Sequence, residues 1–177
     1  TYNQTGDLFQ AVEEFQEVLR IDPESAAAHH NLGVTYFQLQ DPNAAVAEFE
    51  IALIIDPDDP DTHYQLGATY LVLALSGAAP TAAPDLELLA QAVDQFNAAL
   101  DLEEDMPEAL IGLGNVHIKQ GDYAQAIQAL QRAIEKLPNS PEAHYALGEA
   151  YAQTGDVANL AQLPGGPMAA AGGCQNP

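Results

Sequence analysis

The sequence is poor in positive charge. Lys and Arg together number 4 against 26 Asp and Glu, so the 177-residue chain has a formal net charge of -22. Proteins bind nucleic acids and anionic membrane surfaces through clusters of basic side chains that neutralise phosphates. Without such a cluster, neither kind of partner is expected, and the excess of carboxylates is best interpreted as a solvated surface that favours solubility.

Cysteine, tryptophan and long apolar runs are also scarce. The one cysteine, Cys174, cannot form an internal disulfide or build a metal cage by itself, and there is no tryptophan. The most apolar run, Tyr70–Leu75, is far shorter than the roughly 18 residues of a membrane-spanning helix. Because 47% of the residues are hydrophobic, we expect a folded chain. Because its apolar runs are short, we do not expect it to insert into a membrane.

What the sequence does contain is an internal repeat. A Leu-Gly pair recurs in similar contexts, and successive copies of its glycine are 34, 47 and 34 residues apart. The four copies are Leu32-Gly33, Leu66-Gly67, Leu113-Gly114 and Leu147-Gly148. A second pattern, rich in alanine and large apolar residues, occurs at Gln10–Pro23, Ala44–Pro57, Gln91–Glu104 and Gln125–Pro138.

Both patterns predict helices that pack in pairs. The pattern with the Leu-Gly pair gives the first helix of each pair, and the alanine-rich pattern gives the second. Ala45, Phe49 and Leu53 follow one another at steps of four, which places them on one helix face. The glycine of the Leu-Gly pair removes a side chain where the partner helix comes closest. Gly121-Asp122 is typical of a tight turn, with glycine ending one helix and aspartate capping the next. Prolines close the second helices, because proline cannot continue a helix: Pro23, Pro57 and Pro138.

These features together resemble the tetratricopeptide repeat family over about residues 2–156. The resemblance rests on the 34-residue period, the Leu-Gly pair, the aromatic residue that follows the glycine, the alanines of the second helix and the closing prolines. The aromatic residues are Tyr36, Tyr70 and Tyr151; the alanines are Ala45, Ala92 and Ala126; His29, His63 and His144 stand where tryptophan is common. The resemblance implies an all-α, right-handed α-solenoid of antiparallel helix pairs with a concave inner face. It also implies protein interaction rather than catalysis.

The repeats divide the chain into six segments. We expect a partial repeat over 1–23, full repeats over 24–59, 60–106 and 107–140, a partial repeat over 141–163, and a flexible tail over 164–177. The 60–106 repeat holds a 13-residue insertion around Leu75–Glu87, which is predicted to be a projecting loop. Such a loop is either a neutral insertion or a contact with a partner.

The same four-residue motif, Gln-Thr-Gly-Asp, occurs near both ends of the chain, at Gln4–Asp7 and Gln153–Asp156. If each is the turn between two helices of a repeat, the chain begins with a second helix over Asp7–Ile21 and ends with a first helix over Glu142–Thr154. The two half-repeats are complementary. Either they associate head-to-tail into a filament or superhelical polymer, which is the hypothesis we favour, or the sequence is a fragment cut in mid-repeat. The residues predicted for self-association are Leu8, Val12, Phe15, Val18, Leu19, Tyr151, Val157 and Leu160.

A monomeric adaptor that binds a peptide in the concave groove is the alternative. By repeat geometry the groove is predicted to be lined by His30, Val34, Phe37, Tyr64, Leu71, Ile111, Asn115, Tyr145 and Glu149. Some members of the family hold the C-terminal carboxylate of chaperones with lysines and asparagines. Asn115 and Lys119 are the one such pair here, so that activity is not expected; an apolar or proline-containing segment suits the groove better.

No chemistry beyond protein binding is predicted. The sequence has no nucleophile–histidine–acid pattern, phosphate-binding glycine loop or zinc spacing, so we expect no enzyme, no cofactor and no metal site. Asp56–Asp61 lacks the glycine and distal glutamate of a calcium loop and is expected to be a solvated turn. Thr1 in place of methionine, the tail cysteine Cys174 and the scarcity of lysine lean toward an extracytoplasmic or secreted protein, with a cytoplasmic one as the alternative.

Overall fold

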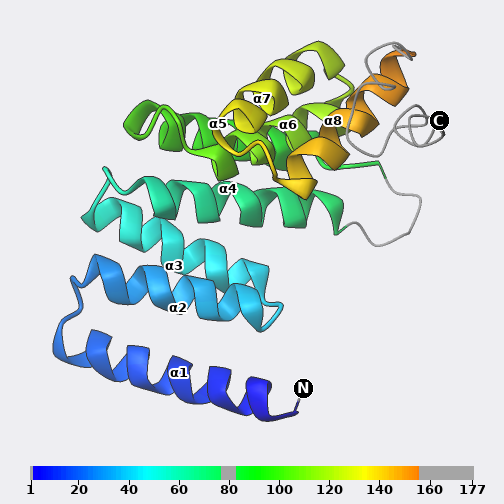
Figure 1. Cartoon of the computed structure of the whole chain (residues 1–177). Helices are drawn as coiled ribbons and strands as arrows, with labels where there is room; N and C mark the ends of the chain where they lie inside the picture. Colours follow the sequence, from blue (N-terminus) through cyan, green and yellow to red (C-terminus); the bar gives the residue numbers. More distant parts are fainter. Residues whose placement is uncertain (1, 77–82, 156–177) are drawn as a thin grey trace, which may run out of the picture. The chain divides into compact units, whose positions relative to one another are not determined.

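The computed structural model describes residues 2–76 and 83–155, which form eight helices and no strand (Figure 1). In chain order the helices are α1 (Tyr2–Ile21), α2 (Ala26–Gln38), α3 (Pro42–Ile55), α4 (Pro60–Leu75), α5 (Leu86–Leu102), α6 (Pro107–Gln120), α7 (Tyr123–Lys136) and α8 (Pro141–Thr154). The predicted all-α fold of antiparallel helix pairs is confirmed. Within the described ranges, no helix combines the length and the apolar content needed to cross a membrane.

Local sequence sets where most helices begin and end. Four of the helices have proline in their first turn, where the missing N–H costs nothing: Pro42, Pro60, Pro107 and Pro141. Each predicted closing proline lies two residues beyond the end of α1, α3 or α7. Gly121 and Gly155 end α6 and α8 in the left-handed conformation, with φ of 84° and 71°, as the turn required. Gln40 adopts the same conformation after α2, with φ of 62°, without the freedom of a glycine.

Two local predictions were wrong. The turn expected at Gln4–Asp7 is absent, and α1 runs without a break from Tyr2. Gly6 is accommodated inside the helix, because a single glycine costs only about 1 kcal/mol there. Asp122 occupies the N-cap position of α7, yet its side chain accepts no capping hydrogen bond.

The chain forms two compact units, Thr1–Glu104 and Asp105–Pro177. In the first unit, α1 packs on α2, α2 on α3, α3 on α4, and α4 on α5. The most deeply buried large side chains of this unit include Phe49 and Phe96, from α3 and α5. Tyr70 of α4 donates a hydrogen bond to Glu50 of α3 at 2.8 Å; burial and this bond raise the pKa of Tyr70 to about 12.

The second unit packs α6 against α7, and α8 against both. Its core includes Leu130 of α7 and Leu147 of α8, with exposed fractions of 0% and 4%. Lys136 of α7 forms an ion pair with Asp105 at 2.5 Å, close to the surface.

The glycine of each Leu-Gly pair has the role that the sequence predicts. A Cβ atom added to Gly33 would lie 2.7 Å from Cε1 of Phe49, and one on Gly114 would lie 2.5 Å from Cγ of Leu130. At Gly67 the nearest atom, Cδ1 of Phe96, would lie at 3.0 Å. The first helix of each pair therefore rests directly on the large buried side chain of the second.

The insertion begins after α4 and ends before α5. Residues 77–82 lie outside the described part, but the two sides of the insertion meet, because the N–H of Asp85 donates to the carbonyl of Ala74 at 3.0 Å. The Asp85 side chain then caps α5 by accepting from the N–H groups of Glu87 and Leu88. The longer connection therefore does not separate the C-terminal end of α4 from the N-terminal end of α5.

Candidate functional site: two open helix faces

The second helices α1, α3, α5 and α7 carry the same pattern, so their exposures can be compared position by position. The large side chain at the centre of the pattern is Phe49 in α3, Phe96 in α5 and Leu130 in α7, with exposed fractions of 0%, 1% and 0%. Its equivalent in α1, Phe15, is only half-buried. The reason is that α3, α5 and α7 are each covered by a glycine-bearing first helix, whereas α1 packs only on α2 among the described helices.

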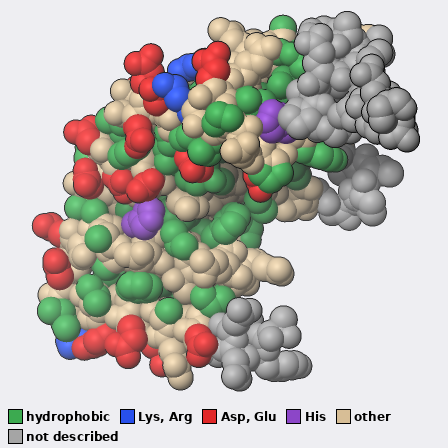
Figure 2. All heavy atoms as spheres, viewed as in Figure 1, with side chains coloured by type: hydrophobic (Ala, Val, Ile, Leu, Met, Phe, Trp, Pro, Cys, Tyr) green, Lys and Arg blue, Asp and Glu red, His purple; other side chains and the backbone are tan. Residues whose placement is uncertain are grey.

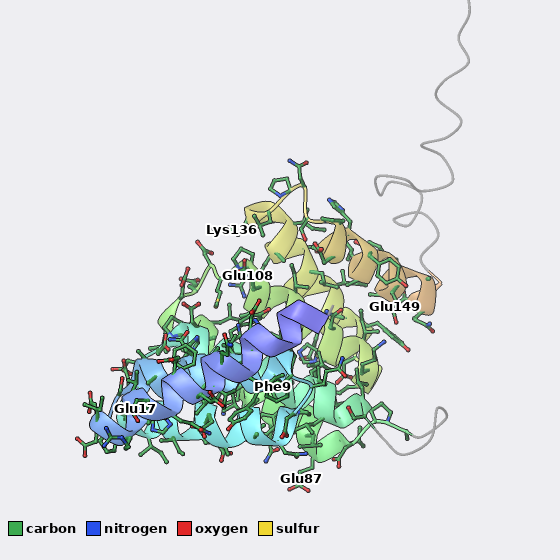
Figure 3. The ribbon with its side chains drawn as sticks, turned by 90° about the horizontal axis from the view of Figure 1, so that it is seen from below. Phe9, Glu17, Glu87, Glu108, Lys136 and Glu149 are labelled. Atoms are coloured by element: carbon green, nitrogen blue, oxygen red, sulfur yellow. The ribbon has the colours of Figure 1, made fainter. Side chains whose placement is uncertain are left out.

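Two further positions of α1 follow the same rule. Val18 is 42% exposed, although the equivalent alanines of the other three helices are almost completely buried. Ala11 is half-buried where its equivalents are fully buried. We call Ala11, Phe15 and Val18 the open face of α1; Figure 3 views the molecule from the side of this helix, with Phe9 and Glu17 labelled on it.

The open face is narrower than the stripe predicted from the sequence. Val12 and Leu19 are half-buried, but so are the residues at the same positions of α3, α5 and α7, so their exposure is ordinary for this helix. Leu8 is also half-buried. Sequence reasoning missed Ala11 because an alanine carries little apolar surface. The recurrence of alanine at this position in all four second helices was the signal that could have identified it.

Phe9 of α1 is 62% exposed, and sequence reasoning also missed it. It lies outside the apolar stripe, where the other second helices have Asn43, Ala90 and Ala124. Nearby, Arg20 donates two hydrogen bonds to the carboxylate of Glu17, which hold the pKa of Glu17 below its usual value. This ion pair is exposed and lies beside the open face.

Helix α8 has an open face of its own. Tyr145 is 78% exposed, whereas the equivalent Tyr64 of α4 is half-buried against Phe96, with ring centroids 6.1 Å apart. Gly148 is half-exposed, although Gly33, Gly67 and Gly114 are buried.

One prediction for α8 was wrong. Tyr151 is 6% exposed in the core of its unit, and its hydroxyl accepts a hydrogen bond from Gln131 at 2.9 Å. Its ring faces the preceding second helix, as that of Tyr36 does, and it is therefore removed from the self-association set. The other two residues predicted there, Val157 and Leu160, lie outside the described residues.

The residues predicted to line a groove lie on first helices in both units. In the first unit, His30, Val34 and Phe37 are half-buried on α2, and Tyr64 and Leu71 are half-buried on α4. His30 is engaged within the chain, because its Nδ1 is hydrogen-bonded to the Thr62 hydroxyl at 2.6 Å and its ring packs edge-on against Phe49.

In the second unit, Ile111 and Asn115 are half-buried on α6, while Tyr145 and Glu149 belong to α8. Glu149 forms an ion pair with Lys119 at 3.2 Å. The lysine of the Asn115–Lys119 pair is therefore already matched by a carboxylate, which disfavours capture of a peptide carboxylate there.

The repeat histidines are structural hydrogen-bonding groups. His29 places Nδ1 2.7 Å from a carboxylate oxygen of Glu48, and His63 places Nδ1 2.8 Å from the side-chain oxygen of Gln95. In His144 the same Nδ1 atom is buried without a hydrogen-bond partner in the described part of the chain. The Nε2 atoms of all three rings bond to the carbonyl of a closing proline: Pro23, Pro57 and Pro138.

Acidic side chains greatly outnumber basic ones in the chain, 26 against 4. On the face drawn in Figure 2, carboxylate side chains lie over both units, and lysines and arginines are few. Among the described residues, no group of three or more His, Cys, Asp or Glu side chains is arranged to hold a metal ion.

The fold and these surfaces define an all-α repeat protein built from helical hairpins, a class that serves as a scaffold for protein interaction and is generally not enzymatic. The chain belongs to the tetratricopeptide repeat family: the family model described as "TPR repeat" matches residues 1–40, 35–73 and 114–155. The stretch between the last two matches contains the insertion. No curated protein sequence matches the chain.

Several solved structures share the fold at low sequence identity. MamA from Desulfovibrio magneticus is 19% identical, with 90% of this chain and 82% of that chain covered and a TM-score of 0.77. PilF from Pseudomonas aeruginosa is 22% identical, with 99% and 73% covered and a TM-score of 0.76. YrrB, described as "a TPR protein with an unusual peptide-binding site", is 22% identical, with 96% and 84% covered and a TM-score of 0.69.

Proposed function

We propose that this protein is a non-catalytic interaction scaffold that self-associates head-to-tail. One observation carries the proposal: Phe15 of α1 is half-buried, whereas the three equivalent side chains of α3, α5 and α7 have exposed fractions of 1% or less. Burying a phenylalanine completely stabilises by roughly 1.5–3 kcal/mol relative to exposure. The open face of α1 therefore favours binding of a first helix from outside the described chain.

A contact between two different faces of the same protein is heterologous. Such contacts do not close by two-fold symmetry, and they continue from copy to copy until the geometry closes a ring or an open polymer forms. We infer a filament or superhelical polymer built from such contacts. A helix pair of this size buries a small interface, so the association is expected to be weak.

The proposal is tested by measuring molar mass against concentration. Sedimentation velocity or light scattering of the purified chain, over on the order of 10–1,000 µM, is expected to show a mass that rises with concentration. Val18→Glu places a charge on the open face and is expected to lower that mass toward the monomer. Ile54→Glu, at an 81% exposed isoleucine of α3, is the matched control and should leave it unchanged. A constant monomer mass of the unmodified chain would disprove self-association.

Peptide binding is the second candidate. Val34, Phe37 and Leu71 are half-exposed on the neighbouring first helices α2 and α4, and they offer an apolar surface within one unit. The peptide-binding site named for YrrB occurs on the same fold. This candidate predicts that a proline-containing apolar peptide binds the chain, that Phe37→Ala weakens the binding, and that Val18→Glu does not affect it.

A further inference from the structure

We propose that the outward side of α3 binds a cationic amphipathic helix of a different protein. Ala47, Ile51 and Ile54 follow one another along α3 at steps of four and three, which places them on one face of the helix. We call these three residues the α3 stripe. The inference goes beyond the proposed self-association and does not rest on it, because it concerns another surface and another kind of partner.

The α3 stripe is exposed in the described structure. Ile54 is 81% exposed, Ile51 is 38% exposed, and Ala47 is exposed as well. Among the described helices α3 packs only on α2 and α4, and its buried residues Phe49 and Ala52 belong to the opposite side of the helix. The stripe therefore lies on a side of α3 that neither neighbouring helix covers.

The other second helices carry mostly charged or polar residues at the three positions of the stripe. In the order of Ala47, Ile51 and Ile54, the equivalents are Glu13, Asp94 and Gln128; Glu17, Ala98 and Arg132; and Arg20, Asp101 and Glu135. All of them except Ala98 are exposed, so the repeat fold does not require an apolar residue at these places. Packing within the chain therefore does not explain why α3 is apolar at all three.

A row of aliphatic side chains with this spacing is a surface on which another helix packs. Side chains at three- and four-residue steps form ridges that fit the grooves of a second helix, and helix recognition commonly uses such anchors. From Ala47 to Ile54 the stripe extends over two helical turns, or about 10 Å. The half-buried Ala44 and Ile55 continue the apolar surface at its two ends.

Carboxylates border the α3 stripe on both sides. Glu48 faces α2, where one of its oxygens is hydrogen-bonded to Nδ1 of His29 at 2.7 Å. Glu50 faces α4, where one of its oxygens accepts a hydrogen bond from the Tyr70 hydroxyl at 2.8 Å. Each bond engages one oxygen of its carboxylate, so the other oxygen can accept from a cationic donor outside the chain.

The chain's own basic residues do not match this border. Arg20 is the one lysine or arginine of residues 1–104, and it forms an ion pair with Glu17. The two lysines, Lys119 and Lys136, form ion pairs within the second unit. Two copies that meet at the α3 stripe would bring carboxylates against carboxylates, which is unfavourable. A second copy is therefore a poor occupant.

A helix with aliphatic residues on one face and lysines or arginines on its flanks matches the α3 stripe. Its apolar side chains pack on the isoleucines, while its long basic side chains reach over them to the carboxylates. Asp56 and Asp58 are exposed just beyond the end of α3 and extend the negative border. The formal net charge of -22 also attracts such a helix before contact.

Binding of a synthetic helix tests the proposal. The probe is a fluorescent peptide of about 18 residues, long enough to form a helix, with leucine and alanine along one face and lysine over the rest. Its control has the same composition in scrambled order. Titration with the full chain, followed by fluorescence anisotropy, is expected to give a dissociation constant on the order of 10–100 µM, as suits a small contact.

The scrambled peptide is expected to bind at least about 10-fold more weakly than the probe, because it has the same charge but no apolar face. Equal binding of the two peptides would show that net charge alone attracts them and would overturn the proposal. Absence of binding of the probe would overturn it as well.

Neutral substitutions locate the site. Ile54→Ser removes an apolar side chain without changing the charge of the chain, and it is expected to weaken binding of the probe at least about 5-fold. Ile51→Ser/Ile54→Ser is expected to weaken it further. The matched control is Ile21→Ser, at an isoleucine of α1 that is 71% exposed, and it should leave binding unchanged. Equal losses for Ile54→Ser and Ile21→Ser would exclude the α3 stripe as the site.

A second pair of variants tests the carboxylates. Glu48→Gln/Glu50→Gln removes two charges beside the stripe but keeps both hydrogen-bond acceptors, and it is expected to weaken binding about 3- to 10-fold. Asp94→Asn/Asp101→Asn removes two charges from exposed positions of α5 and is the control, with an expected loss below about twofold. Thermal unfolding followed by circular dichroism checks that both variants are folded. Equal losses would contradict recognition by the borders of the stripe.

Molar mass against concentration separates this proposal from self-association. Val18→Glu is expected to lower the mass and leave binding of the probe unchanged, whereas Ile54→Ser is expected to do the reverse. A mass lowered by Ile54→Ser would mean that a second copy occupies the α3 stripe, and it would overturn the cationic partner. Binding of the probe with a constant monomer mass would support this proposal and disprove self-association.

Discussion

Helices α5 and α1 carry nearly the same sequence pattern in different surroundings. Phe96 in α5 is 1% exposed, because α4 closes over it with Gly67. Phe15 in α1 is half-buried, because α2 alone packs on this helix among the described ones. The difference teaches that the second-helix pattern specifies a surface that must be covered, and that it does not specify which chain supplies the covering helix.

The largest expected effect is the difference in stability lost when Phe96 or Phe15 is replaced by alanine. Phe96→Ala leaves a cavity in a closed pair and is expected to lower the free energy of unfolding by about 3–5 kcal/mol. Phe15→Ala removes a side chain that is half in water, so the loss in the monomer is expected to be below about 2 kcal/mol. Urea denaturation followed by circular dichroism, at a concentration where the chain is monomeric, measures both. Equal losses would mean that Phe15 is already covered in the monomer.

The glycines sharpen the same comparison from the other side of the pair. Gly33→Ala forces a Cβ against Phe49 and is expected to destabilise the chain by about 1–3 kcal/mol. Gly148→Ala lies in the middle of α8 on a half-exposed face, where alanine favours the helix by about 0.5–1 kcal/mol. The midpoints of thermal unfolding should therefore move in opposite directions. A lower midpoint for Gly148→Ala would show that the chain's own residues already lie against Gly148.

The smallest expected effect concerns the turn within the first pair. Gln40 has a φ of 62°, whereas the equivalent turn after α6 has Gly121. Replacing a strained left-handed residue with glycine relieves backbone crowding but makes the unfolded chain more flexible. Gln40→Gly is therefore expected to stabilise the chain by a few tenths to about 1 kcal/mol. Chemical denaturation measures the change, and the reverse substitution Gly121→Gln serves as its control, with an expected loss.

The fold was largely predictable from the sequence, because its signals are local. The Leu-Gly pairs identified the close contacts with Phe49 and Phe96, and the closing prolines marked the helix ends. Each such signal depends on a single residue's backbone freedom or volume, and the repeat presents it several times. The turn expected at Gln4–Asp7 failed, because the phrase was transferred from the other end of the chain and a glycine alone does not break a helix.

The candidate surfaces were predictable only in part. Phe15 and Val18 follow from the apolar stripe, but the stripe also contains Val12 and Leu19, whose half-burial is ordinary at their positions. Tyr151 is an aromatic residue of the kind expected at an interface, but it lies in the core. A sequence pattern reports which face of a helix is apolar, and it does not report which part of that face a neighbouring helix has already covered.

The sequence by itself determined the repeat, the pairing of a glycine-bearing helix with an apolar one, and the acidic surface, because these depend on residue type and spacing. Tertiary structure alone decided which copies of the pattern are closed and which are open. Burial is a property of two surfaces in contact. Helices with the same pattern are therefore part of the core where a partner lies against them, and their apolar face remains available for binding where none does. The exposed ring of Tyr145 became visible only in that comparison.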